Sequence, residues 1–278
     1  MGNINRKGNL FLLIMFIAID VLSAQTLDFQ TIPNNKKQFG FSFKKAFYST
    51  NRNTTTLSGV YELSANIPLS SKLNIIGNIP YINTSYDIDY GFGQYSYSES
   101  FLGNIFIGLQ TKPQIMENRI SSFTFGLLLP TTSERAALSG ALSDYYYYPT
   151  YFQSRIGLYF NYAYHYINTE GLNYGLELGP NLLVATEINS ATELFVHYGI
   201  TGGYQINKLL LNVEVIGFAS ITSDVKNFDD RFINMFNIGA HWMGKTLTPI
   251  IFYKVYLRNE IRHNIDGVLS LGVNVLID

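Results

Sequence analysis

The chain contains no cysteine, and this absence removes several classes of chemistry at once. Disulfide bonds, thiolate catalysis, cysteine-bound metals and a lipidated N-terminal cysteine are all excluded. Charged residues are also scarce, because Asp, Glu, Lys and Arg make up 14% of the chain, against about a quarter in an average soluble domain. The formal net charge of −1 gives no electrostatic reason to expect nucleic acid as a partner.

Long apolar runs are missing too, so no stretch after the N-terminus reads as a transmembrane helix. The N-terminus itself has two basic residues, a short apolar core at 10–19 and then small residues. We predict a signal peptide over residues 1–24, cleaved after Ser23 or Ala24. A membrane anchor is the alternative, but a bilayer needs roughly twenty apolar residues and this core is too short.

Aromatic residues and alternating patterns are what the sequence has in quantity. It holds 21 Tyr and 20 Phe against a single Trp, and segments such as IGLYFNYAYHY (156–166) alternate large apolar with small or polar residues. A period of two predicts β-strands with two unlike faces. We count about twelve such segments, within a range of ten to fourteen. They lie at 39–47, 61–67, 73–81, 101–109, 123–129, 156–166, 176–184, 194–200, 209–215, 236–242, 247–257 and 269–277.

The connections between these segments alternate between short and long. Short ones lie at 68–72, 112–119, 168–171, 207–208 and 244–246, and longer ones at 83–98, 132–149 and 222–231. Outer-membrane barrels show this asymmetry, with short periplasmic turns and longer extracellular loops. An even strand number would place both ends of the barrel domain on the periplasmic side.

The composition of the second face of the strands indicates which way the apolar face points. It combines many Asn and Gly residues with a few charges: Lys44, Glu62, Glu177, Glu214, Lys254 and Arg258. A soluble sandwich would expose that face to water and would carry many more Lys and Glu. We therefore predict an all-β, transmembrane, antiparallel up-and-down β-barrel over 39–278, with apolar rows facing lipid and these polar residues lining the lumen. Residues 25–38 would form a periplasmic segment or a plug, and a secreted β-sandwich or lectin-like fold is the alternative.

Three histidines, His165, His197 and His241, also fall on the predicted lumen face. They would form a metal site or a base, or else three separate polar residues, since they lie on different strands without ligand spacing. The three glutamates would handle protons, or would pair with the lumen cations. No histidine has Ser two residues later, the arrangement of barrel phospholipases. We expect no enzymatic activity, no metal and no cofactor.

Prolines within strands are candidate interruptions of the barrel wall. Pro80, Pro180 and Pro249 fall inside or near predicted strands, where a missing N–H breaks the ladder. A local bulge or a misplaced strand boundary is one interpretation. The other is a gap through which an apolar solute leaves sideways into lipid.

The segment GNIFIGLQTKPQIMENRISSFTFGLLLPTT (103–132) has features beyond its period. It resembles the outer-membrane family associated with the meta-pathway of phenol degradation, relatives of the long-chain fatty-acid porins. In that pattern Asn104 stands for an acidic residue and Thr132 for a glycine. The shared residues are Gly103, Gly108, Lys112, Gly126, Leu129, Pro130 and Thr131. The resemblance implies passive passage of small, rather apolar molecules through the outer membrane of a Gram-negative cell.

Three functions follow from this sequence. The first is an outer-membrane channel, or porin, for small and apolar solutes, with membrane lipid as its surroundings and the barrel assembly machinery as a partner during biogenesis. The second is a non-conducting barrel that binds a partner or a surface polymer through the loops at 83–98 and 132–149. The third is a lipid-modifying barrel enzyme.

Overall fold

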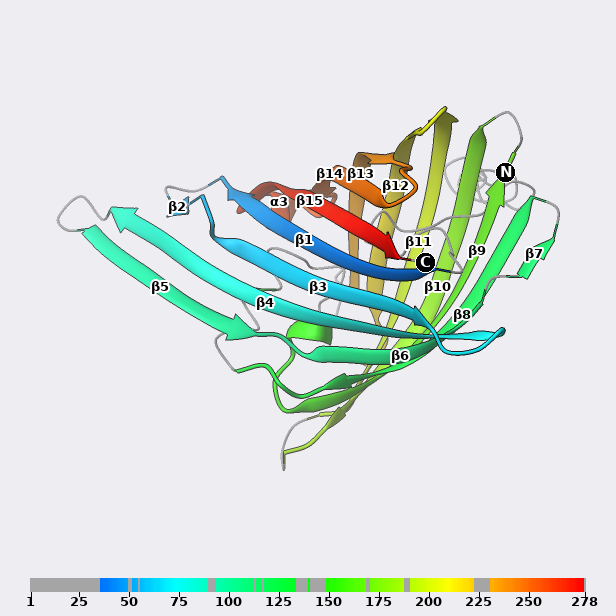
Figure 1. Ribbon diagram of the computed structural model, residues 1–278. Helices are drawn as coiled ribbons and strands as arrows, with labels where there is room; N and C mark the ends of the chain where they lie inside the picture. Colours follow the sequence, from blue (N-terminus) through cyan, green and yellow to red (C-terminus); the bar gives the residue numbers. More distant parts are fainter. Residues whose placement is uncertain are drawn as a thin grey trace, which may run out of the picture.

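The computed structural model describes residues 36–49, 52–54, 56–89, 94–112, 114–116, 118–133, 140, 149–168, 171–187, 191–222 and 231–277. In this part of the chain twelve antiparallel strands close a barrel, as the sequence predicts (Figure 1). The strands are β1 (Lys37–Tyr48), β3 (Gly59–Pro68), β4 (Leu73–Asp89), β6 (Ile105–Thr111), β8 (Arg119–Leu129), β9 (Arg155–Ile167), β10 (Leu172–Ala185), β11 (Glu193–Ile206), β12 (Leu209–Ser220), β13 (Phe232–Trp242), β14 (Leu247–Tyr256) and β15 (Ile265–Ile277). The predicted signal peptide and most of the segment 25–38 lie outside the described residues.

Neighbouring strands follow the order of the sequence around the barrel. β1 pairs with β15 on one side and β3 on the other, and the pairing of β4 with β6 closes the ring. Three further strands, β2 (Arg52–Thr54), β5 (Gln94–Leu102) and β7 (Gln114–Met116), and the one-turn helix α3 (Asn259–Arg262) complete the described elements. No helix in the described ranges has the length and apolar character needed to cross a membrane.

We call the end where β1 begins and β15 ends the turn end, and the opposite end the loop end. The turn end has tight connections whose backbone geometry the sequence anticipates. Gly171 has φ of 93° and Asn207 has φ of 55°, both in the left-handed region that Gly and Asn enter most easily. Asn207 and Lys208 alone join β11 to β12, as expected for a two-residue hairpin turn.

Burial alternates along the strands, but in the sense opposite to that of a soluble protein. The apolar rows are exposed, as Phe41 (45%), Leu63 (56%) and Ile238 (54%) show, whereas their neighbours in sequence are mostly buried. Tyr81 and Trp242 belong to the same exposed surface, at 44% and 50%. An exposed belt of Leu, Ile, Phe and Val around a closed barrel is the surface that a bilayer requires, because closure leaves no unpaired strand edge in the belt.

Two strand assignments made from the sequence are wrong near the loop end. The segment 83–98, predicted as a long loop, is mostly a hairpin: β4 continues to Asp89, and β5 returns from Gln94. The predicted strand 101–109 is instead two strands, β5 and β6, which both pair with β4. In Figure 1 the hairpin of β4 and β5 extends beyond the ends of β6 and β8.

Candidate functional site

The buried inner face of the barrel is divided into two layers. On eight strands the inward row changes from a polar residue to an apolar one at consecutive inward positions. Toward the loop end, Lys44 is followed by Ala46, Glu62 by Val60, Asn181 by Leu183, His197 by Phe195, Glu214 by Ile216, Asn237 by Met235, Lys254 by Tyr256 and Ser270 by Val268. We call the polar members of these pairs, with Asn161 and Glu177, the polar layer. The apolar members, with Leu128, Phe218 and Ile265, form the apolar layer.

Charges in the polar layer lie against partners of opposite or complementary character. Lys44 Nζ lies 3.3 Å from Glu62 Oε2, and both residues are buried. Asn237 Nδ2 donates to Glu214 Oε2 at 2.8 Å. Asn237 is also opposite Lys254 in the sheet, so it lies between Glu214 and Lys254 in strand order. The Lys44–Glu62 contact agrees with the interpretation of Glu62 as an ion-pair partner.

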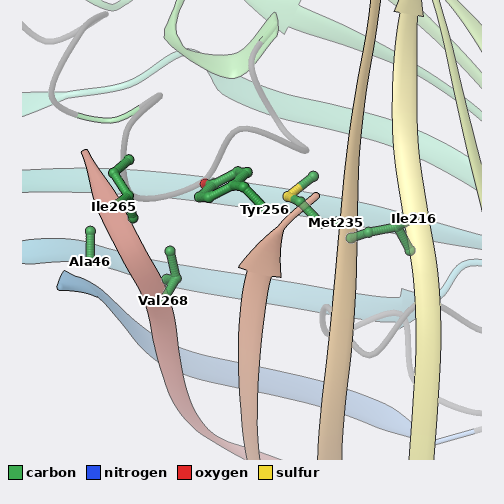
Figure 2. Packing of buried hydrophobic residues seen from close by; sticks show 6 residues of the cluster. All are labelled: Ala46, Ile216, Met235, Tyr256, Ile265 and Val268. Atoms are coloured by element: carbon green, nitrogen blue, oxygen red, sulfur yellow. The ribbon is translucent and has the colours of Figure 1, made fainter. Parts of the chain in front are cut away.

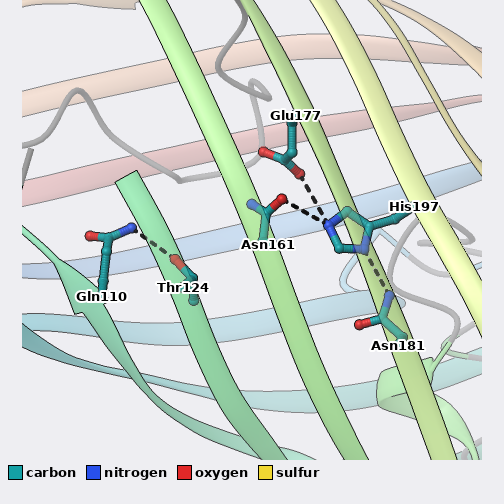
Figure 3. Close-up of polar contacts among 6 residues, drawn as sticks. All are labelled: Gln110, Thr124, Asn161, Glu177, Asn181 and His197. Atoms are coloured by element: carbon teal, nitrogen blue, oxygen red, sulfur yellow. Dashed lines mark hydrogen bonds and ion pairs between the residues drawn. The ribbon is translucent and has the colours of Figure 1, made fainter. Parts of the chain in front are cut away.

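His197 lies at the centre of a second polar group, shown in Figure 3. Its Nδ1 lies 2.8 Å from Asn181 Nδ2, and its Nε2 lies 3.0 Å from Asn161 Oδ1. With the proton on Nε2, the ring donates to Asn161 and accepts from Asn181. Glu177 Oε1 lies 3.9 Å from Nε2, and the ring of Tyr159 stacks on the imidazole at 4.9 Å. These contacts hold the imidazole in one orientation across three strands.

The apolar layer forms two clusters near the loop end. One contains Ala46, Ile216, Met235, Tyr256, Ile265 and Val268, which Figure 2 shows along the inner surface of neighbouring strands. The other contains Leu128, Leu183, Phe195 and Phe218, with Phe106 and Phe152 packed against it. Ile233 packs against both clusters, so the two are continuous. The sequence analysis missed this layer. The sequence does hold an indication of it, because strand ends such as 215–218 carry apolar residues on both faces of the strand.

The remaining predicted lumen residues have varied surroundings. His165 is buried on β9, and His241 lies partly buried on β13. Arg258 lies beyond the end of β14, in the connection to α3, where its Nε donates to Glu260 Oε2 at 3.0 Å. A backbone N–H and the Arg258 guanidinium together lower the pKa of Glu260. Within the described residues no group of three or more His, Asp or Glu side chains is placed to hold a metal ion.

Strand pairing along β4 is interrupted next to Pro80. β4 pairs with β6 as far as Asn78 and with β5 only from Tyr81 onward. Between them the chain leaves the ladder at 103–104, and Gly103 N donates to Pro80 O at 2.9 Å. β8 ends at Leu129, opposite Ile105, and among the described residues β5 pairs only with β4. Among the described residues, pairing is thus continuous toward the turn end, whereas toward the loop end β5 has a paired strand on one side only.

Hydrogen bonds of Asn104 and Thr131 join the two sides of this interruption. Thr131 Oγ1 donates to Gly103 O at 2.6 Å and accepts from Ile105 N at 3.1 Å, in place of strand pairing. The buried Asn104 Nδ2 donates to Phe152 O at 2.5 Å, and its Oδ1 accepts from Thr132 N at 3.1 Å. The residues that carry the family resemblance, Gly103 and Thr131, therefore meet at one place. We call these four hydrogen bonds the latch.

The other two prolines disturb the wall less. At Pro180 the β9–β10 ladder skips two positions, yet pairing resumes in the same register and Pro180 still pairs with Val196 of β11. Pro249 pairs with Val273 of β15, next to the point where the β13–β14 ladder ends at Ile250. Among these three prolines, Pro80 is the one at which the described pairing partner of β4 changes, from β6 to β5.

The exposed apolar belt, closed wall and polar interior define an outer-membrane β-barrel, and comparison with solved structures agrees. An outer membrane channel from Pseudomonas putida F1 has a TM-score of 0.65 at 14% identity, covering 92% of this chain and 100% of that one. The KdgM porin has a TM-score of 0.51 at 8% identity, covering 87% and 99%. No protein-family model and no curated protein matches the sequence. The similarity is one of fold, and it agrees with the predicted antiparallel β-barrel.

Proposed function

We propose that the protein is an outer-membrane channel for small, apolar solutes, which enter at the loop end and leave sideways through the wall interruption at Pro80. The observation that carries this proposal is the position of the apolar layer. Leu128 belongs to that layer and Phe152 packs against it. Asn104, a residue of the latch, donates to the backbone oxygen of Phe152. An apolar solute in this layer would therefore reach the interruption without crossing the polar layer.

The polar layer supports the same route because it makes the direct path through the barrel unfavourable. A solute moving toward the turn end would have to pass buried charges such as Lys44, Glu62 and Glu177, which are 0%, 6% and 0% exposed. Separating a buried ion pair leaves uncompensated charge, at a cost of about 3–5 kcal/mol. Hydrated ions and water meet the apolar layer first, and apolar constrictions resist wetting.

Uptake of an uncharged apolar probe tests this function. We would reconstitute the protein into vesicles with a lipopolysaccharide outer leaflet and follow the fluorescence of N-phenyl-1-naphthylamine as it enters the hydrocarbon. The expected result is faster uptake with protein than in protein-free vesicles, together with a small ion conductance in planar bilayers. Equal uptake with and without folded protein contradicts the proposal.

The projecting hairpin of β4 and β5 favours a second candidate, binding of a surface polymer. Its outward face carries small polar side chains, including Asn83, Ser100 and Asp87, joined across the strands by hydrogen bonds such as Ser96 Oγ to Asp87 Oδ1 at 2.6 Å. Retention of the protein on immobilised lipopolysaccharide, lost with Asp87→Ala and Asn83→Ala, would support that candidate.

A further inference from the structure

The His197 group contains hydrogen-bonding atoms that the network leaves over. His197 uses one atom of each flanking amide, Asn161 Oδ1 and Asn181 Nδ2. Asn161 Nδ2 and Asn181 Oδ1 have no hydrogen-bond partner among the described residues, although the two residues are only 1% and 4% exposed. Buried polar atoms are normally satisfied, so a donor and an acceptor left over on the two amides that flank His197 call for an explanation.

The backbone beneath this group is shaped to hold it. Gly179 lies between Asn161 and His197, on β10, and faces inward like both of them. A Cβ at Gly179 would lie 2.7 Å from His197 Cε1 and 1.8 Å from Phe160 O. The imidazole therefore occupies space that the side chain of any residue other than glycine at position 179 would need. It reaches across β10 to Asn161 on β9. The amides are fixed in direction by the ring rather than free to turn.

The surroundings of the two unused atoms define what could bind them. Toward the loop end, Asn181 is followed by the buried Leu183 and His197 by the buried Phe195, both in the apolar layer. On the other side Glu177 is fully buried, with its Oε1 3.9 Å from His197 Nε2. A ligand here would place an apolar body among Leu and Phe side chains and a hydrogen-bonding head at the amides. A carboxylate head would meet the Glu177 charge at short range.

We infer that Asn161, His197 and Asn181 form a binding site for the uncharged, hydrogen-bonding head of an apolar solute, such as a primary amide or an alcohol, and that Glu177 disfavours carboxylates. The inference rests on the proposed function and narrows its substrate class. The solute's head accepts from Asn161 Nδ2 or donates to Asn181 Oδ1, and a primary amide can do both.

Binding of three probes with one apolar body tests the site. Hexanamide, hexan-1-ol and hexanoate are measured by equilibrium dialysis against the full chain in amphipol, with amphipol alone subtracted. Hexanamide should bind at least about tenfold more tightly than hexanoate, with hexan-1-ol between them. Hexanoate binding as tightly as hexanamide, or no binding of either, overturns the inference. This comparison needs no variant.

Substitutions then locate the site. Asn161→Leu and Asn181→Leu should each weaken hexanamide binding about tenfold, because the hydrogen bond to the solute head is lost at similar volume, together with one to His197. Asn74→Leu, at an equally buried inward asparagine on β4, is the matched control and should change nothing. Glu177→Gln should improve hexanoate binding and leave hexanamide unaffected. Equal effects of the Asn161 and Asn74 variants overturn the inference, whereas failure of the probe-uptake assay alone would overturn only the proposed function.

Discussion

Gly103 and Pro80 lie side by side in the barrel wall, with Gly103 N donating to Pro80 O at 2.9 Å. Pro80 has no N–H to return to the strand beside it, so the ladder cannot continue through this point. A side chain at position 103 would also be obstructed, since a Cβ there would lie 2.7 Å from Pro80 Cγ. The two residues together fix where β5 separates from β6.

Gly103→Ala should therefore widen the interruption. The added methyl group must push the strand segments apart, and we expect faster uptake of N-phenyl-1-naphthylamine in the vesicle assay. Gly77→Ala is the matched control on the same strand as Pro80, because its Cβ would lie at an ordinary 3.6 Å from Phe106 O. Identical uptake by the two alanine variants would show that the contact at Gly103 does not control the route.

Thr131→Val should loosen the latch without changing side-chain volume. The substitution removes the donor to Gly103 O and the acceptor for Ile105 N. Leaving two backbone groups without their partner costs about 1–3 kcal/mol each when they are buried. We expect a lower unfolding free energy in urea and faster probe uptake. Thr131→Ser keeps the hydroxyl and should behave as wild type; a serine variant as impaired as the valine variant would argue against the latch.

The exposed belt makes a separate prediction about stability. Leu63→Arg, at a residue 56% exposed on β3, should lower the unfolding free energy in bilayers by about 2–4 kcal/mol if the side chain faces the bilayer mid-plane. Leu57→Arg is the control, since Leu57 is 65% exposed but lies in the connection before β3. The control should change stability by less than about 0.5 kcal/mol, as surface substitutions usually do. Equal losses of unfolding free energy in the two variants would show that Leu63 does not face the bilayer core.

The Lys44–Glu62 pair should behave as a unit. Lys44→Met alone removes one partner of a buried pair and should cost about 3–5 kcal/mol of unfolding free energy. The double variant Lys44→Met with Glu62→Leu should lose less than the two single losses added together, because neither charge is left alone. Additive losses in urea unfolding would mean that the two charges do not stabilise each other.

Much of the barrel was predictable because a membrane strand keeps the two-residue alternation of a strand in a soluble protein. The apolar face is exposed instead of buried. Phe41 and Leu63 alternate with buried polar residues, and that pattern located the strands and the direction of the apolar face. The outer part of β4 and β5 was missed because it extends past the belt. Beyond lipid the outward face becomes polar, as at Ser85 and Asp87, and the apolar alternation that signals a membrane strand disappears.

The site was less accessible from sequence because its contacts join strands far apart in the chain. His197 could be assigned to the inner face, but its bridge to Asn161 depends on register across two strand pairs and on the absence of a side chain at Gly179. The apolar layer was hidden for another reason. Ile216 and Met235 lie on the same strand faces as the polar lumen residues. Only the closed barrel shows that they contact one another in one cluster.

The most direct test of the account is a reversible lock on the wall interruption. Asn104→Cys with Thr132→Cys suits this purpose, because Thr132 N lies 3.1 Å from Asn104 Oδ1 and the chain has no other cysteine. Uptake of N-phenyl-1-naphthylamine is measured in the same vesicles before and after reduction of a verified crosslink. Uptake should be slight in the oxidised protein and at or above the wild-type rate after reduction. Wild-type uptake through the oxidised barrel would contradict this prediction.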